Sequence, residues 1–256
     1  MPSVETLEAL GAAVSRFPAA APSLEVTAAA RAAAGRSLAG SGLLLLGEMH
    51  GVSENPLLIR ALMAEFGLTS LGLEWPAGLT PVITAFLATG TLAAHDWLWL
   101  GDGRITAGHL AVLAAMTAAG PLDLVLFDDF GSLAGGWSDR DAAMARRLLA
   151  AVPAGGAGTL VVAGNAHTPT GETELGVPLG AQLARQRPGV REIRIRYGSG
   201  AFWNLGPSRF GPVTDADAGP PRLSEQDGEL VLDLPVASEA TVPQRPLGTL
   251  RPGPGQ

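Results

Sequence analysis

The chain has 256 residues, of which 47% are hydrophobic and 16% are charged, so it can bury a large core, and this composition disfavours wholesale disorder. It contains neither cysteine nor lysine, which excludes disulfides, thiolate nucleophiles, thiolate metal sites, Schiff-base chemistry and a P-loop lysine. The net charge of -7 comes without a basic block, so nucleic acid is a poor partner. No apolar run resembles a signal peptide or a membrane span, and the sequence therefore predicts a cytoplasmic protein without membrane association.

The first predicted elements are helices followed by a buried strand. Residues 1–41 are rich in alanine, with apolar positions at helical spacing, and they predict a helical segment packed outside a sheet. The run of leucines at 43–46 is typical of a strand that is covered on both faces, predicted here at 42–47. The next helix is expected to begin near Pro56, with Asn55 as its N-cap.

The rest of the chain alternates apolar runs with helical patterns, which favours a parallel α/β sheet. Further strands are predicted at 70–73, 122–127, 159–163 and 191–196, and helices at 79–88, 106–119, 138–152 and 178–187. The predicted fold is an open, mostly parallel sheet of about four to five core strands flanked by helices, within a domain at 42–205. Residues 206–256 are rich in proline and glycine and predict an extended C-terminal arm with one strand, at 229–234.

Polar side chains follow the predicted strands at the points where the strands end. Glu48 and His50 project to the same side if the chain stays extended, because side chains alternate along a strand. Parallel strands end at one edge of the sheet, where ligands bind in open α/β folds, so these groups are expected to share one cleft. The groups at the strand ends are Glu48, His50, Glu74, Asp128, Asp129, Asn165 and His167.

Several of these residues also have a purely structural interpretation. Asp128 and Asp129 are explained at least as well as caps of the following helix, whereas Glu74 lies in an apolar setting where a buried carboxylate needs a partner. The Gly-Asn-Ala-His context of His167 favours a functional role. His95 and His109 are not tied to a strand end, so they are interpreted as structural or substrate-side residues.

The motifs at these positions resemble a known group of proteins. Gly47-Glu48-Met49-His50 is similar to the opening motif of the ChaN-like and Tiki-like superfamily, which is related to the erythromycin esterase family. The similarity runs from about residue 42 to 205 and keeps the order of the motifs. Its further matches are Leu73-Glu74, a helix ending in Leu-Ala-Thr-Gly, Arg140-Asp141-Ala142-Ala143-Met144-Ala145, Val162-Ala163-Gly164-Asn165-Ala166-His167 and Gly180-Ala181-Gln182-Leu183.

The resemblance implies an active site and a class of reaction. It makes Glu48, His50, Glu74 and His167 the catalytic set, with Arg140 facing the cleft. We expect a hydrolase-like enzyme that acts on a small ester, lactone or amide in a small molecule or peptide, as in a tailoring step. His50 would deprotonate water, Glu48 or Glu74 would orient its ring, and His167 would act as a second acid/base or stabilise an oxyanion. The expected substrate-binding residues are Arg140, Asn165 and Asp128.

Alternatives to this hypothesis stay open at the level of sequence. The site contains no cofactor or one divalent metal, and a metal would be held by His50, Glu74 and His167, as in a metal-dependent Tiki-like peptidase. A ChaN-like protein that binds haem without catalysis is the second alternative, with Tyr197 or a histidine as axial ligand. A degenerate member with a scaffold role is the third. The sequence does not determine the substrate or the oligomeric state.

Overall fold

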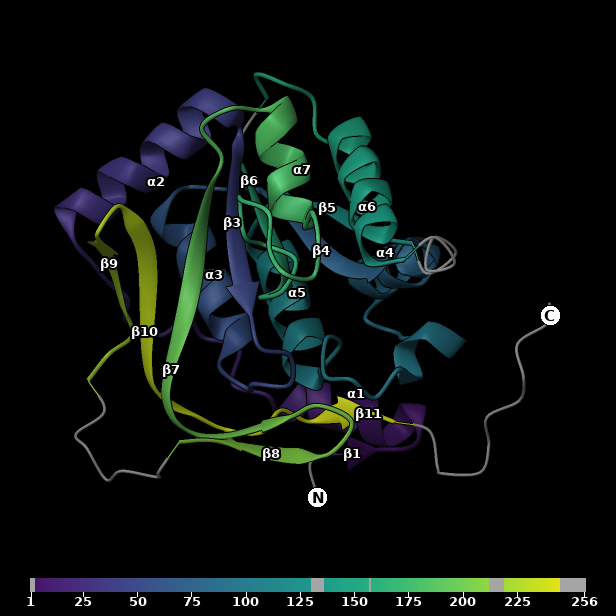
Figure 1. Cartoon of the computed structure of the whole chain (residues 1–256). Helices are drawn as coiled ribbons and strands as arrows, with labels where there is room; N and C mark the ends of the chain where they lie inside the picture. Colours follow the sequence, from purple (N-terminus) through teal and green to yellow (C-terminus); the bar gives the residue numbers. More distant parts are fainter. Residues whose placement is uncertain (1–2, 130–135, 157, 212–218, 245–256) are drawn as a thin grey trace.

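The structure is a computed structural model that describes residues 3–129, 136–156, 158–211 and 219–244 (Figure 1). The helices are α1 (Leu7–Arg16), α2 (Ala28–Ser41), α3 (Asn55–Glu65), α4 (Thr80–Thr89), α5 (Ala107–Ala119), α6 (Trp137–Ala151) and α7 (Leu179–Gln186), with 3₁₀ turns η1 (Ala77–Leu79) and η2 (Asp96–Trp99). The strands are β1 (Ser3–Val4), β2 (Glu25–Val26), β3 (Leu43–Glu48), β4 (Ser70–Pro76), β5 (Asp123–Asp128), β6 (Thr159–Gly164), β7 (Arg191–Trp203), β8 (Pro207–Phe210), β9 (Arg222–Gln226), β10 (Glu229–Ala237) and β11 (Val242–Pro243).

The predicted open, mostly parallel α/β sheet is confirmed. Within the described residues the main sheet has nine strands in the order β2-β9-β10-β7-β3-β6-β4-β5, with β8 paired to β7. The strands expected from the apolar runs form its parallel centre, β7-β3-β6-β4-β5. Strands β3, β4 and β6 are buried along their whole length, as continuous apolar runs predict. Their carboxyl ends therefore meet at one edge of the sheet.

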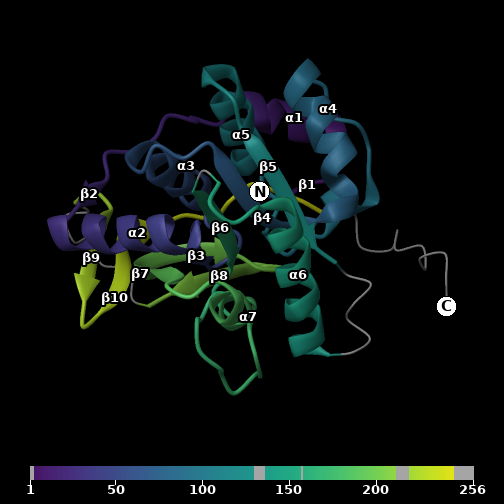
Figure 2. The same ribbon diagram turned by 90° about the horizontal axis from the view of Figure 1, so that it is seen from above.

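Helices cover both faces of the central strands. Figure 2 shows α6 and α7 on one side of the sheet and α3, α4 and α5 on the other. The leucines of β3 divide between the two layers, because side chains alternate along a strand: Leu44 and Leu46 join the core on the side of α2, α3 and α5, and Leu43 and Leu45 join the core under α6 and α7. No helix among the described residues combines the length and apolar character that a membrane crossing requires.

The C-terminal part of the chain widens the sheet. The strand expected at 229–234 is β10, which runs on to Ala237 and lies parallel to β7, while β9 pairs antiparallel with β10. The two-residue turn between β9 and β10 is Asp227-Gly228, with φ of 51° and 83°, the left-handed conformation that a tight hairpin requires. Residues 212–218 and 245–256 of the expected arm lie outside the described residues.

The loop after β3 is fixed by a different set of contacts from those expected. Helix α3 begins at Asn55 itself, and its N-cap, Glu54, makes no side-chain capping bond, so the expected role of Asn55 as a cap is wrong. The amide of Asn55 instead donates to the carbonyl of Met49 at 2.8 Å and accepts the Tyr197 hydroxyl at 3.0 Å. These bonds tie the segment that carries His50 to β7.

The same loop is in backbone contact with the segment before α5 and with the end of β7. The N–H of Gly51 donates to the carbonyl of Gly103 at 3.0 Å, and its own carbonyl accepts the N–H of Trp203 at 3.0 Å. Gly51 has φ of 76°, and a Cβ there would lie 1.7 Å from the carbonyl oxygen of Trp203, so only glycine fits. This contact brings Arg104, one residue after Gly103, to the sheet edge where the strands end.

Candidate active site

Glu48 and His50 form a hydrogen-bonded pair at the end of β3. Glu48 Oε1 lies 3.1 Å from Nδ1 of His50, and the other ring nitrogen, Nε2, faces Glu74 Oε2 at 3.8 Å. The side chain of His50 is 17% exposed, whereas those of Glu48 and Glu74 are 2–3% exposed. Solvent therefore reaches the imidazole while its carboxylate partners stay buried.

Glu74 lies between several elements at the end of β4. The register of β4 against β5 shifts between Leu73 and Pro76, so Glu74 lies at an irregularity of the strand. Glu74 Oε2 accepts the backbone N–H of Gly164, the last residue of β6, at 2.7 Å. This bond fixes the carboxylate against the neighbouring strand and leaves its other oxygen, Oε1, for side chains.

Two guanidinium groups hold Glu74 and Asp128 together. Arg140, in the first turn of α6, donates to Glu74 Oε1 at 2.8 Å and to both oxygens of Asp128 at 2.7 and 3.0 Å. Arg104 donates to the same Glu74 oxygen at 3.0 Å, to Asp128 Oδ2 at 2.7 Å and to Asp102 at 2.7 Å. Burial alone would raise the pKa of Glu74, but the charge of Arg104, followed by those of the nearby histidines and Arg140, outweighs it and holds this pKa well below its usual range.

His167 belongs to a second carboxylate–imidazole pair. Its Nδ1 lies 2.7 Å from Oδ1 of the fully buried Asp141, whose other oxygen accepts the N–H of Leu179 at the start of α7 at 2.8 Å. The indole of Trp137 stacks on the imidazole, with ring centroids 4.4 Å apart and planes 7° apart. His167 Nε2 lies 3.5 Å from Glu74 Oε1. Glu74 is therefore flanked by two histidines, each backed by its own carboxylate.

The charge balance of this site favours a protonated His50. We call the group the charged cluster, made up of Glu48, His50, Glu74, Asp102, Arg104, Asp128, Arg140, Asp141 and His167. Carboxylates outnumber guanidinium groups in it, so the imidazoles are the remaining source of positive charge. Burial by itself would lower the pKa of His50, but the hydrogen bond to Glu48 and the charges of Glu74 and Glu48 together raise it above its ordinary value, against the opposing charge of Arg104.

A titration of the imidazole signals by NMR should show this raised pKa directly. We expect the pKa of His50 to lie above the ordinary value of about 6.5, and we expect Glu48→Gln to lower it because the variant removes the negative hydrogen-bond acceptor. By linkage, this pair stabilises the fold below the unfolded pKa, and the contribution is lost as the pH rises through the folded pKa. The chain has four histidines, so the signals are readily resolved, and those of His95 should not respond to Glu48→Gln. A His50 pKa below the ordinary value would contradict the expectation.

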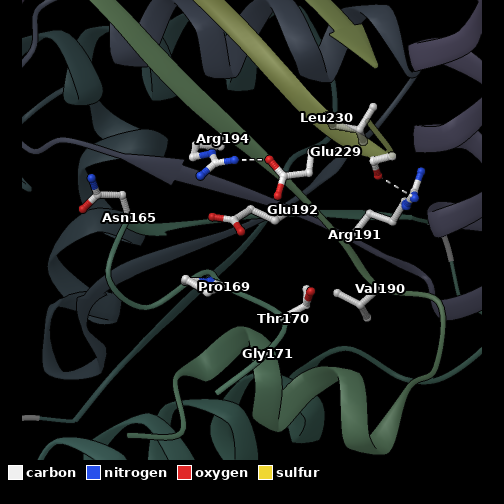
Figure 3. Close-up of a pocket in the computed structure, with 11 residues that line it drawn as sticks. Asn165, Pro169, Thr170, Gly171, Val190, Arg191, Glu192, Arg194, Glu229 and Leu230 are labelled. Carbon is white, nitrogen blue, oxygen red and sulfur yellow. Dashed lines mark hydrogen bonds and ion pairs between the residues drawn. The ribbon is translucent and has the colours of Figure 1, made fainter. Parts of the chain in front are cut away.

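The structure brings most of the predicted site residues together. Glu48, His50, Glu74, Asp128, Arg140 and His167 all lie in the charged cluster. Asn165 does not: its backbone N–H donates to the carbonyl of Glu48 at 2.8 Å, but the residue is exposed and lines a groove of about 440 Å³ between the 165–171 loop and strands β7 and β10. Figure 3 shows Asn165 at one side of this groove, with Glu192 between the loop and the ion pair of Arg194 and Glu229.

Sequence reasoning missed several members of the site. Asp102 and Arg104 lie between two predicted helices, in a segment for which the sequence analysis proposed no site residue, and Asp141 was named there only as part of the motif at 140–145. Their positions depend on which loops meet, which no local pattern encodes. One usable signal was the rarity of basic residues: Arg104 stands alone between Arg60 and Arg140.

The predicted metal ligands do not fit a metal ion. Among the described residues, no group of three or more histidine and carboxylate side chains is arranged to hold one. Glu74 Oε1 already accepts from two guanidinium groups and Oε2 from a backbone N–H, and Arg140 Nη1 lies 3.2 Å from His167 Nε2. These donors already occupy the ligand atoms of Glu74 and His167 that a cation would need.

Tyr197 does not fit the axial-ligand role of a haem protein either. Its hydroxyl accepts the N–H of Met49 at 2.9 Å and donates to Asn55 at 3.0 Å, so the oxygen is engaged on both sides. Burial, followed by the charge of Glu48, raises the pKa of Tyr197 well above its usual range, which disfavours the phenolate that binds iron.

Comparison with known proteins shows similarity in fold. No protein-family model matches the chain, and no curated protein matches it. Among solved structures, it is similar to a mutant of the erythromycin esterase EreC in its open conformation, with a TM-score of 0.56 and 15% identity over 80% of this chain and 93% of that chain. It is also similar to a succinoglycan biosynthesis protein, with a TM-score of 0.53 and 13% identity over 92% and 98% of the two chains. A Bacillus cereus protein matches with a TM-score of 0.53 and 11% identity over 91% and 99%. At these identities the relationship is distant and concerns the fold.

Proposed function

We propose that this chain is a hydrolase-like enzyme that acts on a small ester, lactone or amide, and that it is a distant relative of the erythromycin esterases within the ChaN-like and Tiki-like superfamily. The observation that carries the proposal is the arrangement of His50. Its Nδ1 is held by a buried carboxylate, its Nε2 is directed at a second carboxylate, and its side chain is the part of the predicted catalytic set that solvent reaches best. An imidazole oriented in this way is suited to general acid–base chemistry.

In the proposed reaction, His50 is the general base. Its Nε2 takes a proton from water, the resulting hydroxide attacks the carbonyl carbon, and the carbon–oxygen or carbon–nitrogen bond to the leaving group breaks. The proton on Nε2 then passes to the leaving group. Glu48 keeps the ring oriented and stabilises the imidazolium that forms, because it is buried and bonded to Nδ1.

The second histidine pair lies on the other side of Glu74 from His50. His167 is backed by Asp141 and stacked on Trp137, so its ring is held in one orientation. Its Nε2 accepts a hydrogen bond from Nη1 of Arg140 at 3.2 Å, so of the two roles expected from the sequence we assign it that of the second acid/base. Arg140 is 4% exposed and donates to both Asp128 and Glu74, so we assign it the positioning of these carboxylates in place of the substrate contact expected from the sequence.

The part of the substrate remote from the carbonyl is assigned to the groove shown in Figure 3. A Cβ placed on Gly164 would lie 3.1 Å from Nε2 of His50, and the next residue, Asn165, lines the groove. The volume of about 440 Å³ suits a small molecule or a short peptide segment. The polar lining, which includes Thr170 and Glu192, favours a substrate with hydroxyl or amide groups.

A panel of model esters, lactones and amides tests the proposal. We expect saturable hydrolysis of at least one class, with kcat/KM falling as the pH drops through the raised pKa of His50, because a general base acts only in its neutral form. Product formation is followed at a series of pH values in buffers of constant ionic strength. Chelators should leave the rate unchanged. A rate that increases toward low pH, or a panel in which no member is hydrolysed at any pH, would count against this function.

A further inference from the structure

One carboxylate oxygen in the charged cluster has no hydrogen-bond partner. Glu48 is 3% exposed, and its Oε1 is bonded to His50, but its Oε2 is buried without a hydrogen bond among the described residues. A buried ionised oxygen is costly unless positive charge or a donor faces it. The group that faces it is the imidazole of His109 on α5, whose Nε2 lies 3.9 Å away. That distance is an electrostatic contact and is longer than a hydrogen bond.

The contacts of Thr106 determine which nitrogen of His109 carries the proton. Thr106 is the N-cap of α5, and its hydroxyl oxygen accepts the backbone N–H of His109 at 3.1 Å. The same oxygen lies 2.9 Å from His109 Nδ1. Thr106 is fully buried. Among the described residues, Nδ1 of His109 is the acceptor that lies within reach of its hydroxyl proton. The hydroxyl therefore donates to Nδ1, and the neutral ring carries its proton on Nε2, directed toward Glu48.

The ring of His109 is held in one orientation. It lies edge-on to the indole of Trp75, with centroids 5.9 Å apart and an interplanar angle of 80°, and Trp75 Nε1 donates to the carbonyl of Arg104 at 2.9 Å. Burial lowers the pKa of His109, and the charge of His50 adds to this effect while that of Glu48 opposes it, so the neutral form is favoured. His109 is thus a rigid, uncharged N–H dipole.

We propose that His109 is a positioning residue, which holds Glu48 through its Nε2–H so that Oε1 stays on Nδ1 of His50. The proposal rests on the proposed function, because it assigns His109 a role in the reaction of His50. The carboxylate of Glu48 lies between two imidazoles: Oε1 contacts His50, in the loop that follows β3, and Oε2 faces His109, on α5. Glu48 and His50 also interact electrostatically with charged or titratable groups on other elements, namely Tyr197 on β7, Glu74 on β4 and Arg104 before α5.

The first arm of the test is spectroscopic and needs no substrate. In ¹⁵N-labelled protein at pH 7, the imidazole signals of His109 should show a protonated Nε2 and an unprotonated Nδ1. Glu48→Gln should move the Nε2–H proton of His109 upfield, because it removes the negative charge opposite. Thr106→Val should produce a mixture of the two tautomers, whereas the matched control Thr106→Ser, which keeps the hydroxyl, should retain the Nε2–H form.

The second arm compares two substitutions of His109 in the hydrolysis assay. His109→Leu removes the N–H and should lower kcat by about 10–100-fold with little change in KM, a loss of the size seen when a group that orients a metal-binding histidine is removed. His109→Gln can place an amide N–H near the position of Nε2 and should recover most of that loss. A purely structural role would lower stability in both variants without separating kcat from KM.

The two arms distinguish failure of this inference from failure of the proposed function. The inference is overturned if Nδ1 of His109 carries the proton, or if the chemical shift of the His109 Nε2–H proton does not change in Glu48→Gln. Either result holds whether or not any ester is hydrolysed. An unchanged kcat in His109→Leu, or a glutamine variant no better than the leucine variant, overturns it as well. If His109→Leu does not fold, the spectroscopic arm decides alone.

Discussion

Replacing Arg140 with methionine should lower the free energy of unfolding by about 3–5 kcal/mol, the range seen when one partner of a buried ion pair is removed. Arg140 is 4% exposed and Asp128 is 1% exposed, so water cannot take over the lost contacts. Asp128 Oδ1 would lose the hydrogen bond that it accepts from Nε of Arg140. Asp128 Oδ2 and Glu74 Oε1 would still accept hydrogen bonds from Arg104. Urea unfolding measures the change, and the melting temperature should fall by roughly 10 °C for a chain of this size.

Arg147 provides a matched control on the same helix. It pairs with Asp129 near the surface, where the two side chains are 45% and 36% exposed, so Arg147→Met should cost about 1 kcal/mol or less. The double variant Arg140→Met with Asp128→Asn should recover part of the loss, because it removes the unpaired charge together with its partner. Equal stability of Arg140→Met and Arg147→Met would show that the buried contacts of Arg140 contribute little to the free energy of unfolding.

The sequence predicted which side chains lie near one another at the sheet edge because parallel sheets have a simple geometry. The apolar runs of β3, β4, β5 and β6 identify the strands, and the residues just past them must meet at one edge. Glu48, Glu74 and His167 could therefore be placed near one another without any knowledge of loops. The same reasoning failed for Asn165, because its side chain lies on the groove side of a turn whose direction the sequence does not specify.

The residues that hold the site in place were not predictable in this way. Arg104 reaches Glu74 because the backbone of Gly103 packs against that of Gly51, a contact between segments about fifty residues apart. Asp141 joins His167 because α6 packs against α7, where the other oxygen of Asp141 accepts the N–H of Leu179. Tertiary contacts of this kind have no period in the sequence.

The C-terminal strands, in contrast, had a signal that was not used. Asp227-Gly228 between β9 and β10 is the dipeptide preferred in two-residue hairpin turns, and both residues adopt positive φ. Because residues 206–256 are rich in proline and glycine, the sequence analysis predicted an extended arm there. Recognising the turn would have predicted an antiparallel pair of strands, which is what β9 and β10 form.

Substitution of His50 should abolish hydrolysis while the fold persists. Losing a general base costs about two to four orders of magnitude in rate, or roughly 3–5 kcal/mol of barrier. His50 lies beyond the end of β3 and its side chain is 17% exposed, so its removal opens no core cavity. His50→Ala, however, leaves the buried Glu48 Oε1 without its partner, which adds a stability loss that has nothing to do with catalysis.

His50→Asn separates these two effects. The asparagine amide can place an N–H near the position of Nδ1, so the bond to Glu48 is kept, but it has no group at the position of Nε2. We expect this variant to be as inactive as His50→Ala and to unfold within about 0.5 kcal/mol of the parent chain, the range of surface-like substitutions. His95→Asn is the control, because His95 caps η2 away from the charged cluster. If His50→Asn hydrolysed the substrate at the parent rate, Nε2 would not be the base, and the role assigned to Glu48 would fail with it, since that role was assigned from the bond between Glu48 and the His50 ring.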